Sequence, residues 1–195
     1  MYESKDKMVS HPEHYKGSMG VEPIDFIHEI CKNIYIDTKA HDYITDGHIL
    51  AAFDLGQVVK YVCRYTKKNG SQDIDKAIWY MQDFEDSVWQ VLPGTTLKPP
   101  KEIGYDDAID MSEAIINSVG FAPIRLWAHA LCDNKLLEMS DKEFGAQALV
   151  LTWVYIVSTD YRRFNHVSAL KIALEYLYKI VKEREDEENA RKPAC

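Results

Sequence analysis

Apolar residues recur every three or four positions through residues 53–85, and this spacing predicts two helices that each bury one stripe of side chains. The run from Lys67 to Gly70 predicts the end of the first helix, because a glycine there takes up a left-handed conformation. Ser71 is then expected to cap the second helix, with Asp73 in its first turn. The two stripes are predicted to contain Val59, Val62, Cys63, Ile74, Ala77, Ile78 and Met81.

Helical spacing also flanks this hairpin on both sides. Pro23 suits the first turn of a helix whose apolar face carries Ile24, Ile27 and Ile30. The pattern over residues 33–46 is irregular and predicts a loop or a short helix. Further helical segments are expected at residues 105–118, 121–133, 141–164 and 167–188.

The run from Val150 to Val157 is rich in β-branched residues, so on its own it fits either a strand or a buried helix. A capping-box pattern, Ser140 followed by Glu143, precedes the run and favours the helix. The chain is therefore predicted to be all-α, a helical hairpin core with a second helical half packed on it. The predicted divisions are a helical domain at residues 8–92, a linker at 93–104, a second helical region at 105–185 and a charged tail at 186–195.

The composition is that of a soluble globular protein, with 46% apolar and 28% charged residues in a chain of 195. The net charge of −8 argues against nonspecific binding to nucleic acid, which needs many contacts of Lys and Arg with phosphates. A local cationic pocket in an acidic protein suits a small anionic ligand better. The N-terminus lacks an apolar signal core and no apolar run is long enough to span a membrane, so we expect a cytoplasmic protein without a membrane partner.

Three cations share one face of the first hairpin helix, since Lys60, Arg64 and Lys67 stand at i, i+4 and i+7. Lys76 and Tyr80 repeat the four-residue step on the second helix. Such a face is either a solvated basic surface or a binding site for phosphate, and the spacing alone does not decide between them.

Gly56 lies one turn before Lys60, inside the first hairpin helix. Glycine costs about 1 kcal/mol relative to alanine in a helix, so a close approach of backbone or ligand is expected there. Two nearby aromatic residues, Tyr61 and Tyr80, stand at spacings that are most often typical of a core. An aromatic ring beside Lys60 and Arg64 is also suited to stack on a nucleobase.

Two pairs of residues near the N-terminus have side chains that bind metals in other proteins. His11 and His14 supply only two nitrogens, which is half of a metal site, so a loop that contacts phosphate or base and a purely structural role are the alternatives. Glu22 and Asp25 share a helical face and suit a magnesium ion with its waters. The alternative is that they are the carboxylates that a helix dipole favours in a first turn.

An acidic cluster opens the segment at residues 105–118. It is either a solvated first turn or the metal-binding element of a nucleotide hydrolase, since carboxylates that share one helical face suit both. The sequence has no G-x-x-x-x-G-K-[ST] motif, which excludes a P-loop. The cluster consists of Asp106, Asp107, Asp110 and Glu113.

Together these residues form a pattern that begins with His-Pro-x-His-Tyr from His11 and Glu-x-Ile-Asp from Glu22. It continues with Gly56, Lys60, Tyr61, Arg64, Lys68, Gly70, Asp73, Lys76, Ala77 and Tyr80. This pattern resembles the SaV-like phage domain of unknown function, also known as a phage nucleotide kinase domain because it occurs in a nucleotide kinase of T7-like phages. The resemblance covers residues 8–88. Gln57 stands where the family has Asn, and the segment before Gly56 is longer than usual.

The resemblance implies a phage protein of nucleotide metabolism in the host cytoplasm. The implied reaction is phosphorylation of a deoxynucleoside monophosphate by ATP with Mg²⁺. The catalytic cations would then be Lys60, Arg64 and Lys76, and the metal contacts Glu22, Asp25 and Asp73. The nucleotide contacts would be His11, His14, Tyr15, Gly56, Tyr61, Lys67, Lys68 and Tyr80.

Two other functions fit the same chain. The first is a phage protein without catalytic activity that binds a nucleotide or a host protein. The second is an all-α nucleoside triphosphate pyrophosphohydrolase, which would use the acidic cluster of residues 106–113 instead. The expected partners are a small nucleotide and, for the first alternative, a host protein; bulk nucleic acid is not expected, and we expect a homo-oligomer.

Overall fold

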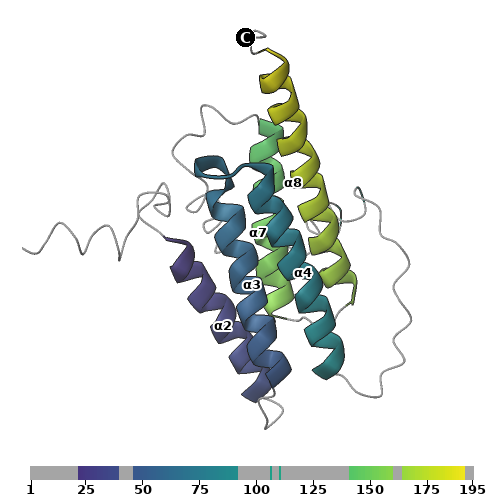
Figure 1. Cartoon of the computed structure of the whole chain (residues 1–195). Helices are drawn as coiled ribbons and strands as arrows, with labels where there is room; N and C mark the ends of the chain where they lie inside the picture. The colour runs from purple at the N-terminus through teal and green to yellow at the C-terminus, as the bar shows by residue number, and fades with distance from the viewer. Residues whose placement is uncertain are drawn as a thin grey trace, which may run out of the picture.

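The computed structural model describes residues 22–39, 46–91, 106, 110, 141–159 and 164–191. These residues contain helices and turns without a strand, which confirms the all-α prediction. In Figure 1, α3 and α4 lie side by side, α2 lies along α3, α8 lies along α4, and α7 packs behind them. The elements are α2 (Pro23–Lys39), α3 (Asp46–Arg64), the 3₁₀ turn η2 (Tyr65–Lys67), α4 (Ser71–Val91), α7 (Asp141–Thr159) and α8 (Phe164–Ala190).

One hydrophobic core joins all of these helices. Phe26 of α2, Leu55 of α3, Phe84 of α4, Trp153 of α7 and Leu174 of α8 are all buried within it. The second helical half is therefore packed on the hairpin, as predicted. Among the described residues, no helix is long and apolar enough to cross a membrane.

Helix α2 is longer than the sequence predicted. It runs through Lys39, whereas residues 33–46 were expected to be a loop or a short helix. The helix continues because Ile34 extends the buried stripe of Phe26 and Ile30, and because Asn33 donates a hydrogen bond to the Ser158 hydroxyl of α7 at 3.1 Å.

The β-branched run in α7 is helical, as predicted, and its burial explains why the pattern was ambiguous. Val150, Val154 and Val157 are 0% exposed, so this helix is apolar around most of its circumference. Glu143, predicted to form a capping box, accepts a hydrogen bond from the Tyr65 hydroxyl at 2.9 Å. Ser140, the other half of that box, lies outside the described residues.

The turn between α3 and α4 has the predicted left-handed glycine, with φ of 54° at Gly70. The start of α4 is capped differently from the expectation. The Ser71 hydroxyl donates to the Glu185 carboxylate of α8 at 2.6 Å, and the Ser71 backbone N–H donates to the same carboxylate at 2.8 Å. A carboxylate from another helix thus satisfies an N–H group at the positive end of α4.

Candidate functional site

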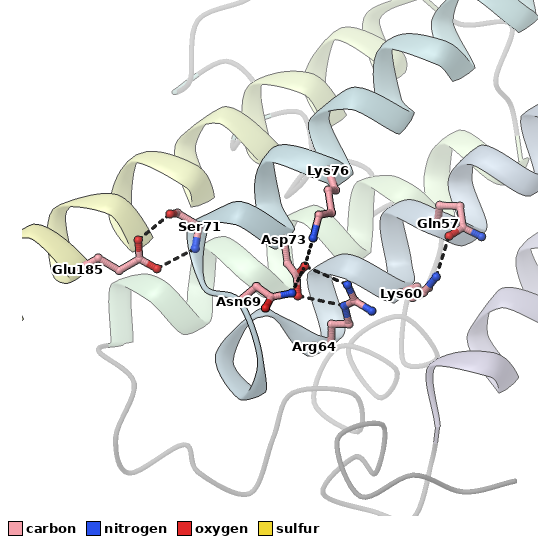
Figure 2. Close-up of polar contacts among 8 residues, drawn as sticks. All are labelled: Gln57, Lys60, Arg64, Asn69, Ser71, Asp73, Lys76 and Glu185. Atoms are coloured by element: carbon pink, nitrogen blue, oxygen red, sulfur yellow. Dashed lines mark hydrogen bonds and ion pairs between the residues drawn. The ribbon is translucent and has the colours of Figure 1, made fainter. Parts of the chain in front are cut away.

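The centre of the site is a buried ion pair between the two hairpin helices. Arg64 Nε lies 3.0 Å from Asp73 Oδ2, and a terminal Arg64 nitrogen lies 3.0 Å from Asp73 Oδ1. The Asp73 side chain is 0% exposed and the Arg64 side chain 11%. Figure 2 shows the guanidinium of α3 facing the carboxylate of α4. This two-point geometry holds both side chains in fixed positions.

Two further donors reach the same carboxylate. Asn69 and Lys76 each donate to Asp73 Oδ1 at 3.0 Å (Figure 2). Burial acts to raise the pKa of Asp73, but the hydrogen bonds from Arg64, Asn69 and Lys76 outweigh it and lower the pKa to about 2. Asp73 is therefore ionised at neutral pH and neutralises part of the cationic face.

The cations converge on one aromatic ring, that of Tyr61. Its centroid lies 4.5 Å from the Arg64 guanidinium, 5.1 Å from Lys60 Nζ and 5.5 Å from Lys76 Nζ. Tyr61 also stacks on Tyr80, with centroids 5.7 Å apart and planes 20° apart. We call these five residues with Asp73 the hairpin site.

The aromatic part of the site continues toward the start of α3. Tyr80 contacts Phe53 edge-on at 6.0 Å and Trp79 edge-on at 4.8 Å. Phe53 is 52% exposed and Trp79 is 57% exposed. Sequence analysis missed Phe53, although it precedes Lys60 by seven residues and so lies on the same helical face. The site thus combines a cationic end with an exposed aromatic end.

Among the described residues, Asp73 pairs with Arg64 and Lys76, and no carboxylate pairs with Lys60. Its Nζ donates to Gln57 Oε1 at 3.1 Å, one turn back along α3 (Figure 2). Gln57 is the residue at which the sequence departs from the SaV-like pattern, and here its side chain positions Lys60 with a neutral acceptor.

Gly56 lies close to another helix. A Cβ built on this buried glycine would lie 3.2 Å from Cγ2 of Ile27 in α2. The glycine therefore allows α2 to pack closely against α3. The close approach expected from the sequence is found, and the neighbour is a core side chain.

The other described candidate residues belong to the start of α2 and to the turn before α4. Asp25 accepts the backbone N–H of Glu22 at 2.9 Å, which is one half of a capping box at the start of α2. Lys67 and Lys68 belong to the turn before α4. His11, His14 and Tyr15 lie outside the described residues.

The acidic cluster is described only in part. Asp106 and Asp110 are exposed and helical, whereas Asp107 and Glu113 lie outside the described residues. Within the described ranges, no group of three or more His, Cys, Asp or Glu side chains is arranged to hold a metal ion. At Asp73, a metal ion would have to displace the donors that already occupy both oxygens.

A second buried carboxylate in the hairpin, Asp54, was not found from the sequence. It is 1% exposed, and neither oxygen has a hydrogen-bond donor among the described residues. Burial, followed by the charge of Asp83, raises the pKa of Asp54 to about 6. Asp54 in turn contributes to a raised pKa of Tyr80, behind burial and Tyr61. Helical periodicity within α3 does not show that Asp54 is buried without a hydrogen-bond donor among the described residues.

Comparison with protein families gives a match in the first half of the chain. A family described as a protein of unknown function, DUF3310, matches residues 9–82. The matched segment includes every residue of the hairpin site. No curated protein matches the chain, and no solved structure matches it either. The nucleotide kinase part of the resemblance stays a prediction.

Proposed function

We propose that the protein binds a nucleoside phosphate at the hairpin site and acts in phage nucleotide metabolism as a deoxynucleoside monophosphate kinase. The observation that carries this proposal is the convergence of Lys60, Arg64 and Lys76 on the ring of Tyr61. Cations and aromatic rings in one place match the two halves of a nucleotide, its phosphates and its base.

The phosphate end is assigned to the two lysines. Three cations face one carboxylate at the site, so a net positive charge remains. Lys60 is bound by a neutral amide, and the Lys76 side chain is 44% exposed although it pairs with Asp73. Both ammonium groups are thus able to reach a phosphate in solvent, whereas Arg64 is fixed by its buried partner.

Arg64 acts in this proposal as a positioning residue. Its guanidinium holds Asp73 and lies against the Tyr61 ring, so it fixes the two groups that place Lys76 and the aromatic stack. Its charge adds to the field at the phosphate end without a direct contact being required.

The proposed reaction moves the γ-phosphoryl group of ATP to a phosphate oxygen of the deoxynucleoside monophosphate. The products are ADP and the deoxynucleoside diphosphate. Such transfer depends mainly on positioning and on cations near the equatorial oxygens, which Lys60 and Lys76 would supply. Magnesium would arrive with the phosphates of ATP, since the oxygens of Asp73 are already occupied.

Calorimetric titration of deoxynucleoside monophosphates tests the binding step. Lys60→Ala should weaken binding roughly tenfold or more, the scale of one charge-assisted hydrogen bond, and the loss should shrink at high salt. Lys182→Ala is the matched control, because it removes one exposed cation from α8. Equal affinities in wild type and Lys60→Ala would mean that the hairpin site does not bind the nucleotide.

Incubation of each monophosphate with ATP and Mg²⁺ tests the transfer step. Chromatography should show the diphosphate and ADP appearing in equal amounts, more slowly in Lys60→Ala than in Lys182→Ala. Nucleotide binding without any transfer would instead support the second candidate, a non-catalytic nucleotide-binding protein. Asp73 binds both Arg64 and Lys76. This favours the non-catalytic candidate, because neither cation is then available only to a phosphate.

A further inference from the structure

A pocket lies between α2 and α3, beside the aromatic end of the hairpin site. Its volume is about 430 Å³, within the range of cavities that hold small ligands. Cys31 and Tyr35 line it from α2, and Ala52 and Phe53 line it from α3. Its described walls are mostly apolar, which suits the faces of a planar heterocycle.

Phe53 connects this pocket to the hairpin site. The ring lines the pocket and contacts Tyr80, which stacks on Tyr61 among the three cations. Lys60 follows Phe53 by two turns on the same helical face, about 10 Å along the helix axis. One face of α3 therefore carries an apolar pocket and a cationic cluster, and the distance between them suits a small elongated molecule.

We infer that this pocket binds the nucleobase of the nucleotide whose phosphates lie against Lys60 and Lys76. The inference rests on the proposed function, since it places the other end of the same ligand. Phe53 would stack on one face of the base, and the apolar walls would remove the base from water. The ligand class is thus a nucleotide with an intact base, rather than inorganic polyphosphate or a sugar phosphate.

Cys31 gives a direct measure of occupancy in the unmodified protein. It is a free, half-buried thiol on the pocket wall, and its pKa is raised by burial, so alkylation is expected to be slow. The rate of reaction with N-ethylmaleimide can be followed at Cys31 by peptide mass spectrometry. A saturating deoxynucleoside monophosphate should slow this rate at least tenfold. Inorganic pyrophosphate at saturation should leave the rate unchanged.

Filling the pocket gives a second measure. Ala52→Phe places a ring in the pocket and should weaken binding of the monophosphate at least tenfold while pyrophosphate binds as in wild type. Glu175→Phe is the matched control, because it adds the same ring at an exposed position of α8. Far-UV circular dichroism checks that both variants fold, and if Ala52→Phe does not, protection of Cys31 in the wild type decides.

The outcomes separate this inference from the proposed function. If nucleotide binding depends on Lys60 while Cys31 reacts at an unchanged rate, the pocket is not the base site and the proposed function stands. Equal nucleotide affinities in Ala52→Phe and wild type would also show that the pocket is not the base site. If neither nucleotide nor pyrophosphate binds the wild type, both proposals are wrong.

Discussion

Asp73 and Asp54 are both buried carboxylates of the α3–α4 hairpin, and their surroundings move their pKa values in opposite directions. Four hydrogen bonds lower the pKa of Asp73 to about 2, against the effect of its burial. Asp54 has no hydrogen-bond donor within the part of the chain that the structure describes, and burial raises its pKa to about 6. Burial alone therefore does not determine the charge of a carboxyl group; the donors around it do.

Asp54→Asn should stabilise the protein at neutral pH. The folded pKa of about 6 lies above the ordinary value of 3.8, so the folded state favours the protonated acid. The stability that protonation contributes is lost as pH rises from about 4 through 6. Thermal unfolding should give a higher Tm for the variant at pH 7.5 and nearly equal values at pH 4. Asp86→Asn, at an exposed position of α4, should show no such pH dependence. A lower Tm for Asp54→Asn at pH 7.5 would contradict this prediction.

Arg64→Ala should destabilise the protein by about 3–5 kcal/mol, because Asp73 would keep a buried charge without its main partner. Urea denaturation measures the loss. Lys60→Ala, from the same helical face, should change the free energy of unfolding by less than about 1 kcal/mol. The double change Arg64→Ala with Asp73→Ala should recover part of the loss. If Arg64→Ala and Lys60→Ala both change the free energy of unfolding by a similarly small amount, the ion pair of Arg64 and Asp73 is not buried in solution.

The sequence predicts the cations of the site better than their roles. Helical spacing places Lys60 and Arg64 on one face, and the structure brings both to Tyr61. The spacing does not show that Arg64 is bound by Asp73, because that contact joins two helices. Periodicity within one helix specifies a face, and only packing specifies the partner across it.

At the scale of elements, the turn between α3 and α4 tests how strictly the backbone is determined. Gly70→Val should cost about 1 kcal/mol or more, since φ is 54° and an added Cβ would overlap the Glu185 carboxylate. Gly145→Ala is the contrasting change: in helix α7 a Cβ there has no neighbour within 4 Å, so we expect a gain of about 0.5–1 kcal/mol. Chemical denaturation of both variants provides the comparison, and a neutral Gly70→Val would refute the assignment of the turn.

Helix boundaries were predicted well where local signals mark them and poorly where they do not. The stop at Gly70 was found from the sequence. The continuation of α2 to Lys39 was missed, because the sequence around Ile34 is irregular. The packing of α7 against this part of α2 buries Ile34, and the sequence does not show that contact. The helices expected at residues 105–118 and 121–133 lie largely outside the described residues.

At the scale of the molecule, the last helix is part of the core and not an appendage. Leu174 of α8 is 0% exposed, so Leu174→Ala should cost about 2–5 kcal/mol of unfolding free energy. The loss should appear in one cooperative transition that is the same by fluorescence and by circular dichroism. Two separate transitions would show instead that the hairpin and the last two helices unfold independently.

The overall class was predictable from the sequence because the apolar spacing is helical in α3 and α4, and because a capping-box pattern favours a helix for the β-branched run of α7. The packing of the helices around one core was not predictable, because the spacing within a helix does not show which neighbouring helix its buried stripe contacts. The expected homo-oligomer stays a prediction, which sedimentation analysis would test. Exposed apolar residues on α3 and α4, among them Ile49 and Trp79, are the surface to examine first.

The contact between Ser71 and Glu185 has a consequence for the order in which the protein is made. The two residues are 114 positions apart along the chain. The whole hairpin is therefore synthesised well before the carboxylate that completes the start of α4. The nascent hairpin should be loosely ordered at its tip until α8 docks, so ligand binding should begin only after α8 has been synthesised.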